Sequence, residues 1–179
     1  MSREELHSIA DAAMDQYFLV SPEKLSKIYD AAAITAEDRV VEVGAGAGTV
    51  SHEMPPTKSL TVVELDDRLL DLLRRHAPAN AKLIHGDALH VIRDLQFDVL
   101  IANLPNTITE ELLPILPDLD FRTAVLAVGE HTDVSKLGRQ FDVSEVTTIS
   151  GDDFAPPQPS VSRIVKVASR GHRDNASTA

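Results

Sequence analysis

The sequence contains no cysteine and no tryptophan among its 179 residues, and it has no long hydrophobic run. The absence of cysteine excludes disulfide bonds and thiolate metal sites. Its seven histidines show no spacing such as H-x-x-x-H, so we expect no metal site. No stretch approaches the roughly 18 apolar residues that cross a membrane, and the charged first residues do not resemble a signal peptide. These absences predict a cytoplasmic protein without a membrane partner.

Positive charge is also scarce. Lysine and arginine number 17 against 28 aspartates and glutamates, which gives a formal net charge of -11. Proteins that bind phosphate backbones usually carry a basic face, so the overall field of this chain repels RNA at long range. A local basic patch is still compatible with the composition, and an acidic surface is also expected in a salty cytoplasm. Composition alone does not separate these interpretations.

Short apolar runs alternate with helical patterns along the chain. Strands are predicted at residues 39–43, 60–65, 81–86, 97–102, 123–129, 143–149 and 162–168. Helices are predicted at residues 21–34, 66–77, 88–95 and 109–116. The first helix is introduced by Ser21 as N-cap and Pro22 at the first helical position. The first five strands are nearly continuous hydrophobic runs, as expected of parallel strands that are covered on both faces.

The alternation of strands and helices predicts an α/β domain with a doubly wound, Rossmann-like, seven-stranded and mostly parallel sheet. The last two predicted strands are joined by "SGDDFAPPQPS", which is too short and too rich in proline for a crossover helix. We therefore expect an antiparallel pair at the edge of the sheet. The single domain is expected to span residues 1–169, and the small, polar residues 170–179 are expected to form a disordered tail.

Three glycines follow the first predicted strand in "VVEVGAGAGTVS". Gly44, Gly46 and Gly48 allow a sharp turn and a close approach of the backbone to a ligand. Thr49 stands where the dinucleotide-binding pattern G-x-G-x-x-G/A needs a small residue. The spacing G-x-G-x-G after the acidic Glu42 resembles instead the first motif of S-adenosylmethionine (AdoMet) methyltransferases. The alternative is a small-residue turn without a ligand.

Acidic residues end the next two predicted strands. Glu64, which Leu65 follows, is a candidate acceptor for the ribose hydroxyls of an adenosine ligand, or it is a solvated acid at a strand end. Asp87 is a candidate partner for the adenine amino group, with Ala88 supplying a backbone contact, or it is the N-cap of the following helix. The carboxyl ends of successive strands form the edge where open α/β sheets bind ligands. The joint pattern therefore favours a nucleoside site.

The fourth predicted strand ends in the segment "NLP", residues 103–105. The side-chain carbonyl of Asn103 and the backbone carbonyl of Leu104 can both accept a hydrogen of one amino group, and Pro105 fixes the local backbone. Holding both hydrogens draws the nitrogen toward tetrahedral geometry and frees its lone pair for methyl transfer. We predict these three residues as the catalytic segment. The alternative is a turn that ends the strand.

Several short segments carry a family resemblance. They are, in chain order, "QYFLVSP", "VEVGAGAG", "VELD", "GDAL", "NLP" and "FAPPQPSVSRIV". Together they resemble the motifs of ribosomal RNA adenine N6-dimethyltransferases over roughly residues 14–168. The resemblance implies AdoMet as cofactor, with Gln16 and Leu19 closing over it. It also implies an adenine of RNA as the acceptor, flipped out to stack on Phe154.

The sequence departs from the family pattern at several positions. Asn106 replaces the aromatic residue that follows N-L-P and forms the other side of the base-binding site, so about 1–3 kcal/mol of stacking is exchanged for a polar contact. Tyr17 stands where the family usually has asparagine. Pro55 and Pro56 shorten the helix that the glycine loop should open. The segment after the fifth strand is shorter than the family pattern leads us to expect, and we expect no C-terminal RNA-binding helical domain.

Three functions are compatible with these observations. An AdoMet-dependent N-methyltransferase for RNA adenine should carry a positive stripe beside the catalytic segment, for which Arg139, Arg163 and Lys166 are candidates. A methyltransferase for a small molecule or a protein should have a closed apolar pocket roofed by Tyr17 and Phe18. The same two aromatic residues are also suited to a hydrophobic staple under the first helix. A non-catalytic AdoMet-binding protein would need a damaged cofactor pocket.

Overall fold

The computed structural model describes residues 1–171. The tail predicted at 170–179 therefore lies outside the described residues, except for Arg170 and Gly171. Arg170 forms an ion pair with Asp142 at 2.9 Å, so defined contacts continue past residue 169. No helix within this part of the chain is both long enough and apolar enough to cross a membrane.

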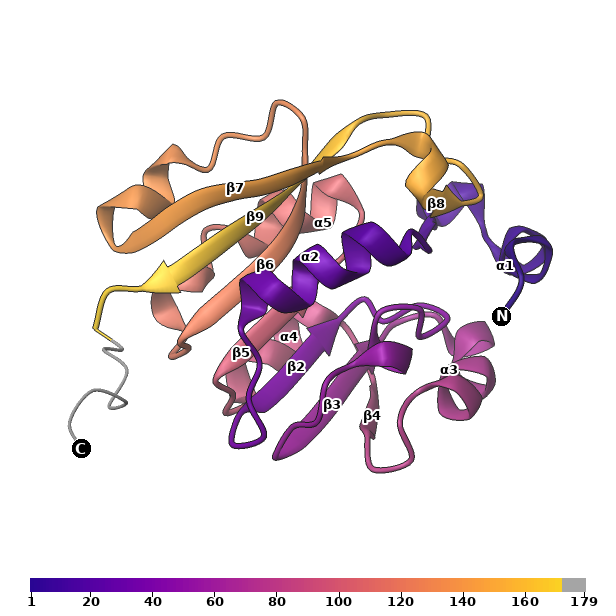
Figure 1. The fold of residues 1–179 in the computed structure, drawn as a ribbon, viewed down its shortest axis with the longest axis horizontal. Coiled ribbons are helices and arrows are strands. Elements are labelled where there is room, and N and C mark those ends of the chain that lie inside the picture. The colour runs from indigo at the N-terminus through magenta and orange to yellow at the C-terminus, as the bar shows by residue number, and fades with distance from the viewer. Residues whose placement is uncertain (172–179) are drawn as a thin grey trace.

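One sheet of seven strands organises the fold, in the order β4-β3-β2-β5-β6-β9-β7 (Figure 1). The strands are β2 (Arg39–Val43), β3 (Ser59–Glu64), β4 (Lys82–His85), β5 (Val99–Ala102), β6 (Thr123–Gly129), β7 (Phe141–Ile149) and β9 (Ser162–Ser169). The strands from β4 to β6 are parallel, whereas β9 lies between β6 and β7 and is antiparallel to both. The predicted fold class and the antiparallel pair at the sheet edge are confirmed.

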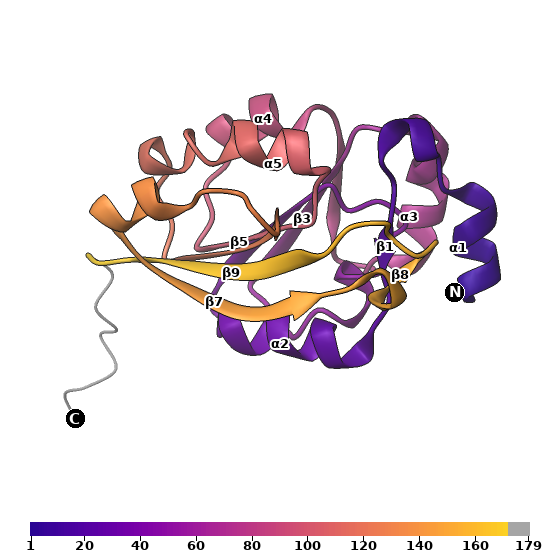
Figure 2. The same cartoon turned by 90° about the horizontal axis from the view of Figure 1, so that it is seen from above.

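Helices cover both faces of this sheet. The helices are α1 (Arg3–Ile9), α2 (Pro22–Ala32), α3 (Leu70–His76), α4 (Ala88–Val91) and α5 (Asn106–Leu112), of which α1 packs beside β8, away from these faces. In Figure 2, α4 and α5 lie on one face and α2 lies on the other. Side chains of β2 alternate accordingly: Val41 packs in one cluster with Ile92 and Leu112, and Val40 packs in another with Ile28 of α2. This double cover explains why the strands are continuous hydrophobic runs.

Three phenylalanines pack together at the amino-terminal end of the parallel strands. Phe121 stacks between Phe97 and Phe141, with ring centroids 6.4 Å and 5.2 Å away. The three side chains are buried and precede or begin β5, β6 and β7. The opposite end of the sheet, where the parallel strands finish, is thereby left to loops that face a ligand.

Two short strands were not predicted from the sequence. β1 (Phe18–Leu19) and β8 (Phe154–Ala155) form a separate antiparallel pair, with Leu19 opposite Phe154. Arg3 strengthens this junction by donating from its guanidinium to the backbone carbonyl of Phe154 at 3.0 Å. Strands of two residues are too short to show a periodic pattern, so only the folded chain reveals the pair.

Three predicted helices differ from the observed ones, and the shortening after the glycine loop is as expected. The helix expected at 88–95 is α4 only as far as Val91, and a 3-10 turn follows at Ile92–Asp94. The helix expected at 109–116 is α5, which begins at Asn106 because Pro105, with φ -48°, serves as its N-cap. The helix expected at 66–77 starts as a 3-10 turn, and α3 follows. After the glycine loop only a 3-10 turn forms, at Ser51–Glu53, because Pro55 and Pro56 come directly after it.

Replacing Phe121 by alanine should destabilise the protein by about 3–5 kcal/mol, because a buried ring in the middle of the stack is lost. Urea unfolding followed by circular dichroism measures this change. The exposed Leu65→Ala serves as control and should change the free energy of unfolding by less than about 0.5 kcal/mol. Equal stability of the Phe121→Ala variant and the parent would contradict the importance of the stack.

Candidate functional site

The carboxyl ends of the parallel strands form the wall of a cavity. The strand order changes direction between β2 and β5, and open α/β sheets bind ligands in the crevice at such a switch point. A cavity of about 420 Å³ lies there, which falls within the usual range for small-molecule sites. Its lining comes from the loops after β2, β3, β4 and β5 and from the segments before β1 and after β8.

The glycine loop after β2 is held in conformations that require glycine. Gly44, Gly46 and Gly48 have φ of 69°, 57° and 83°. An added Cβ at Gly44 would clash with Leu104, and one at Gly46 would lie 2.9 Å from the ring of Phe18. The loop is thus packed between the predicted catalytic segment and β1, and no larger residue fits at either position.

Glu64 ends β3 and organises the backbone around the cavity. Its Oε2 accepts a hydrogen bond from the N–H of Gly46 at 2.5 Å, and its Oε1 accepts from the N–H groups of Leu65 and Asp66, both at 2.8 Å. Glu64 is only 7% exposed. The description of Glu64 as a solvated acid at a strand end is therefore wrong.

Glu42 is a buried acid on the wall of the cavity. It is 2% exposed, and its Oε2 is one of three buried side-chain polar atoms without a hydrogen-bond partner among residues 1–171. Burial, assisted by the charge of Glu64 and partly offset by the nearby Ser51 hydroxyl, raises the pKa of Glu42 to about 8. Such an unpartnered buried acid next to a cavity is costly unless a ligand satisfies it.

Asp87 caps α4 at the carboxyl end of β4. Its Oδ1 accepts from the N–H of Leu89 at 2.8 Å, and its Oδ2 lies 3.0 Å from Nδ1 of His90. The N-cap interpretation is therefore confirmed. Asp87 also lines the cavity with Ala88, so the position agrees with a nucleoside contact, which stays a prediction.

The N-L-P segment lies where β5 passes into α5. Asn103, Leu104 and Pro105 all line the cavity. The amide of Asn103 makes no hydrogen bond to other side chains or backbone within the described residues. The carbonyl of Leu104 accepts from the hydroxyl of Thr109 at 3.4 Å, and this hydroxyl is also 3.4 Å from the carbonyl of Ala127. Both predicted acceptors thus keep free hydrogen-bonding capacity.

Most predicted site residues meet at this cavity. Those that line it are Gln16, Glu42, Gly44, Gly46, Glu64, Leu65, Asp87, Ala88, Asn103, Leu104, Pro105, Asn106 and Phe154. Two do not. Leu19 is fully buried in the core as the β1 partner of Phe154, and Gly48 faces Leu73 behind the loop. Their predicted contacts with a cofactor are therefore indirect at most.

Other residues of the cavity wall were missed. Met14, Glu111, Gln158 and Ser162 line it, and Asp66 stands behind it as a hydrogen-bond acceptor for Gln16. Gln158 and Ser162 lie inside the quoted "FAPPQPSVSRIV" segment, so that motif could have pointed to them. Asp66 likewise ends the quoted "VELD" segment. Met14 and Glu111 had no sequence signal, because their placement depends on tertiary packing.

The wall of the cavity is acidic. Its acidic residues within the described chain are Asp15, Glu42, Glu64, Asp87 and Glu111, and none of its lining residues is lysine, arginine or histidine. Arg139, Arg163 and Lys166 lie outside it. Arg163 instead pairs with Glu145 at 3.3 Å. The positive stripe expected beside the catalytic segment is absent from this lining. Within residues 1–171, no group of side chains is arranged to hold a metal ion.

Comparison with known proteins identifies the family. The family model described as ribosomal RNA adenine dimethylase matches residues 10–137. The chain belongs to this dimethylase family. A probable ribosomal RNA small subunit methyltransferase A of Methanosarcina mazei is 35% identical over 123 residues, covering 67% of this chain and 45% of the relative. The corresponding Dehalococcoides mccartyi protein is 32% identical over 181 residues, covering 88% and 62%. The chain thus spans about half to two thirds of these relatives.

Solved structures agree with the dimethylase fold. A dimethyladenosine transferase from Plasmodium falciparum superposes with a TM-score of 0.77 at 25% identity, covering 86% of this chain and 63% of that one. The 23S rRNA methyltransferase ErmE superposes with a TM-score of 0.76 at 19% identity, covering 86% and 70%, and supports the fold alone. The family resemblance and the class I methyltransferase fold predicted from the sequence are confirmed.

The cavity suits the adenosine-containing, positively charged cofactor of this dimethylase family. AdoMet carries a sulfonium and an ammonium group, and the lining offers carboxylates without competing cations. The unpartnered Oε2 of Glu42 gives such a charge a buried partner, and the glycine loop gives a ligand close access to the backbone. On these observations the residues fit the cofactor.

Glu42 should make the stability of the dimethylase domain depend on pH. Its folded-state pKa of about 8 exceeds the ordinary 4.5, so the folded protein binds this proton more tightly than the unfolded chain does. The free energy of unfolding should therefore fall as pH rises between these values, by at most about 1.4 kcal/mol per pH unit. Urea unfolding at several pH values measures the slope. Glu42→Gln should remove it, and the exposed Glu37→Gln should keep it.

Proposed function

We propose that this chain is an AdoMet-dependent N-methyltransferase that transfers a methyl group to the amino nitrogen of an adenine in RNA. The observation that carries the proposal is the position of the N-L-P segment. Asn103 and Leu104 line the same acidic cavity as Glu42 and Glu64, at the carboxyl ends of adjacent strands. An amino-group site and a site for a cationic donor therefore share one cavity.

The cofactor would be held by residues at three strand ends. Bound AdoMet would supply a methyl group on a positively charged sulfur. Glu64 would accept a hydrogen bond from the ribose, Asp87 would face the base, and Leu65 would pack against the adenine as an exposed apolar side chain. Glu42 would be the buried carboxyl group that stabilises the positive charge of AdoMet.

The acceptor amine would be positioned by two carbonyl oxygens. Asn103 Oδ1 and the backbone oxygen of Leu104 would each accept one of its hydrogens, which frees the nitrogen lone pair. The contact from Thr109 to the Leu104 oxygen is long, at 3.4 Å, and leaves one lone pair for the substrate. The nitrogen gains positive charge as it is methylated and then loses a proton, and the carboxylates of the lining favour that charge.

Family membership supports RNA adenine as the acceptor. The matched relatives are named as ribosomal RNA small subunit methyltransferases. Phe154 borders the cavity opposite Leu19 of the β1–β8 pair, but it is only 2% exposed and packs in the core with Leu19, so a flipped-out base would reach only the buried edge of its ring. Asn106 would contact the acceptor from the other side. A cytoplasmic location and a domain boundary near residue 169 remain predictions.

One observation favours a second candidate, a methyltransferase for a small molecule or a protein amine. The cavity lining holds no basic residue, and Asn106 stands where stacking on a base needs an aromatic ring. A polyanionic acceptor gains no attraction from such a wall. The acceptor-side residues Asn106, Glu111 and Gln158 would instead suit a polar or cationic amine.

Replacing Asn103 by alanine should lower the methyl-transfer rate on the order of 100-fold, because one of two positioning acceptors is lost, while AdoMet affinity stays the same. Single-turnover kinetics and calorimetry measure the two quantities. Asn80→Ala is the matched control, since Asn80 is exposed in a turn before β4 and does not line the cavity. An unchanged rate in Asn103→Ala would remove Asn103 from the chemistry.

The acceptor is best identified with radiolabelled AdoMet in fractionated cell extract, using the Asn103→Ala protein as background. Label on adenine in RNA is the expected result. Label on protein or on metabolites would support the second candidate instead. Thermal stabilisation by AdoMet without any transfer would leave the non-catalytic interpretation, a binding protein of this fold.

A further inference from the structure

The segment that precedes β1 covers one side of the cavity and is tied down by side chains. We call residues 11–16 the N-terminal strap. Met14, Asp15 and Gln16 of the strap line the cavity. The backbone hydrogen bonds within the strap, from Met14, Asp15 and Gln16, all end on Asp11 or Ala12. Its connection to the sheet edge therefore depends on side-chain contacts.

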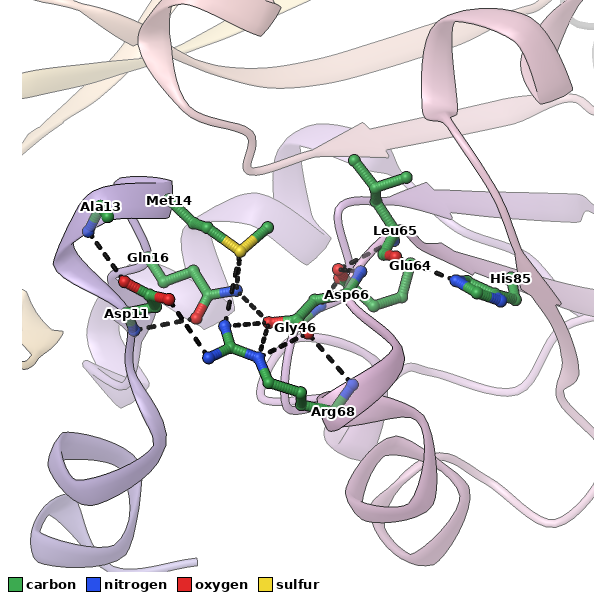
Figure 3. Close-up of polar contacts among 10 residues, drawn as sticks. All are labelled: Asp11, Ala13, Met14, Gln16, Gly46, Glu64, Leu65, Asp66, Arg68 and His85. Carbon is green, nitrogen blue, oxygen red and sulfur yellow. Dashed lines mark hydrogen bonds and ion pairs between the residues drawn. The ribbon is translucent and has the colours of Figure 1, made fainter.

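These contacts converge on the turn after β3, as Figure 3 shows. Gln16 Nε2 donates to Asp66 Oδ2 at 2.7 Å, while Gln16 Oε1 accepts from the N–H of Asp11 at 3.0 Å. Arg68 lies between the two acids, 3.2 Å from Asp11 Oδ2 and 2.7 Å from Asp66 Oδ2. One amide and one guanidinium thus join the strap to Asp66.

Asp66 is the centre of this junction. Its side chain is only 3% exposed, and both of its oxygens accept from the guanidinium of Arg68, at 2.9 Å and 2.7 Å. The Arg68 guanidinium, together with Gln16, lowers the pKa of Asp66 to about 2. Asp66 is therefore charged at neutral pH, and the bond from Gln16 is charge-assisted, which makes it stronger than a bond between neutral groups.

The same turn carries the predicted ribose ligand. Oε1 of Glu64 accepts two N–H groups, including that of Asp66, and Oε2 accepts one from Gly46. A carboxylate has about four acceptor positions, so only one is left, on Oε2. One ribose hydroxyl can take this position, and a second one competes with the N–H groups of Gly46, Leu65 and Asp66 for the same carboxylate. The ribose site and the turn that holds Asp66 therefore share the acceptor positions of Glu64.

We propose that Asp66 is a positioning residue that couples the ribose site at Glu64 to the N-terminal strap, so that bound cofactor and closed strap stabilise each other. This inference rests on the proposed function, because it assumes that an AdoMet-type nucleoside binds at Glu64. Coupling of this kind is reciprocal. Cofactor binding should protect the strap, and loosening the strap should speed cofactor release.

Dissociation of S-adenosylhomocysteine, measured by displacement in a stopped-flow instrument, tests the coupling without methyl transfer. Asp66→Asn keeps an acceptor for Gln16 but loses the ion pair, and it should raise the dissociation rate about tenfold while the association rate changes little. Arg74→Ala is the matched control, because it breaks the exposed Asp71–Arg74 pair, 2.6 Å long, away from the cavity. Its rate should equal that of the parent.

A double-mutant cycle separates positioning from simple destabilisation. Gln16→Ala removes the amide link but leaves the Arg68 link, so adding Asp66→Asn should raise the dissociation rate by clearly less than the product of the two single effects. Hydrogen exchange of residues 11–16 should slow on ligand binding in the parent but not in Asp66→Asn. If Asp66→Asn does not fold, Arg68→Ala replaces it in the cycle.

The outcomes distinguish this inference from the proposed function. Equal dissociation rates in the parent and Asp66→Asn, or fully additive effects with Gln16→Ala, would overturn the coupling and leave the methyltransferase proposal intact. A parent protein that binds neither AdoMet nor S-adenosylhomocysteine would overturn both. Non-additive rates with ligand-dependent protection of the strap support the coupling.

Discussion

The carboxylate of Glu64 is the interaction on which the functional end of this molecule depends. It collects N–H groups from two loops, one at Gly46 and one at Leu65 and Asp66. Loops at the end of a parallel sheet leave backbone donors without strand partners, and buried donors must be paired. One acid at the tip of β3 meets this need, and the glycine loop, the turn after β3 and the strap take their positions from it.

The sheet and the strand-end residues of the site could be predicted because both follow from the local pattern of hydrophobic residues. Continuous hydrophobic runs mark β2, β3, β5 and β6, and a chain that alternates these runs with helices brings their carboxyl ends to one edge. Glu64, Asp87 and Asn103 follow from that rule alone. The role of Asp66 could not be predicted, because the "VELD" motif does not show which side chain Asp66 contacts and only the fold places Gln16 against it. The burial of Leu19 and the pairing of β1 with β8 likewise depend on contacts between distant segments.

Charge acts in opposite directions on the methyl donor and the methyl acceptor of the proposed reaction. The acidic cavity attracts a cationic donor, and an overall charge of -11 opposes a polyanionic acceptor. Arginines near the sheet edge are engaged with acids, as in the pairs of Arg163 with Glu145 and Arg170 with Asp142. Selection of the acceptor is therefore expected to depend on shape and hydrogen bonding around Asn106 and Phe154 more than on long-range attraction.

The short β1–β8 pair has a consequence for folding during translation. Its two strands come from near the beginning and near the end of the described chain, and Phe154 reaches the cavity wall only when β8 is in place. Contacts between such distant residues carry a large loop-closure cost and form late. The nascent chain can build β2, β3 and β5 early, but it acquires a finished pocket only after the residues of β8 have been synthesised. A shortened translation product would therefore hold the scaffold without the complete pocket.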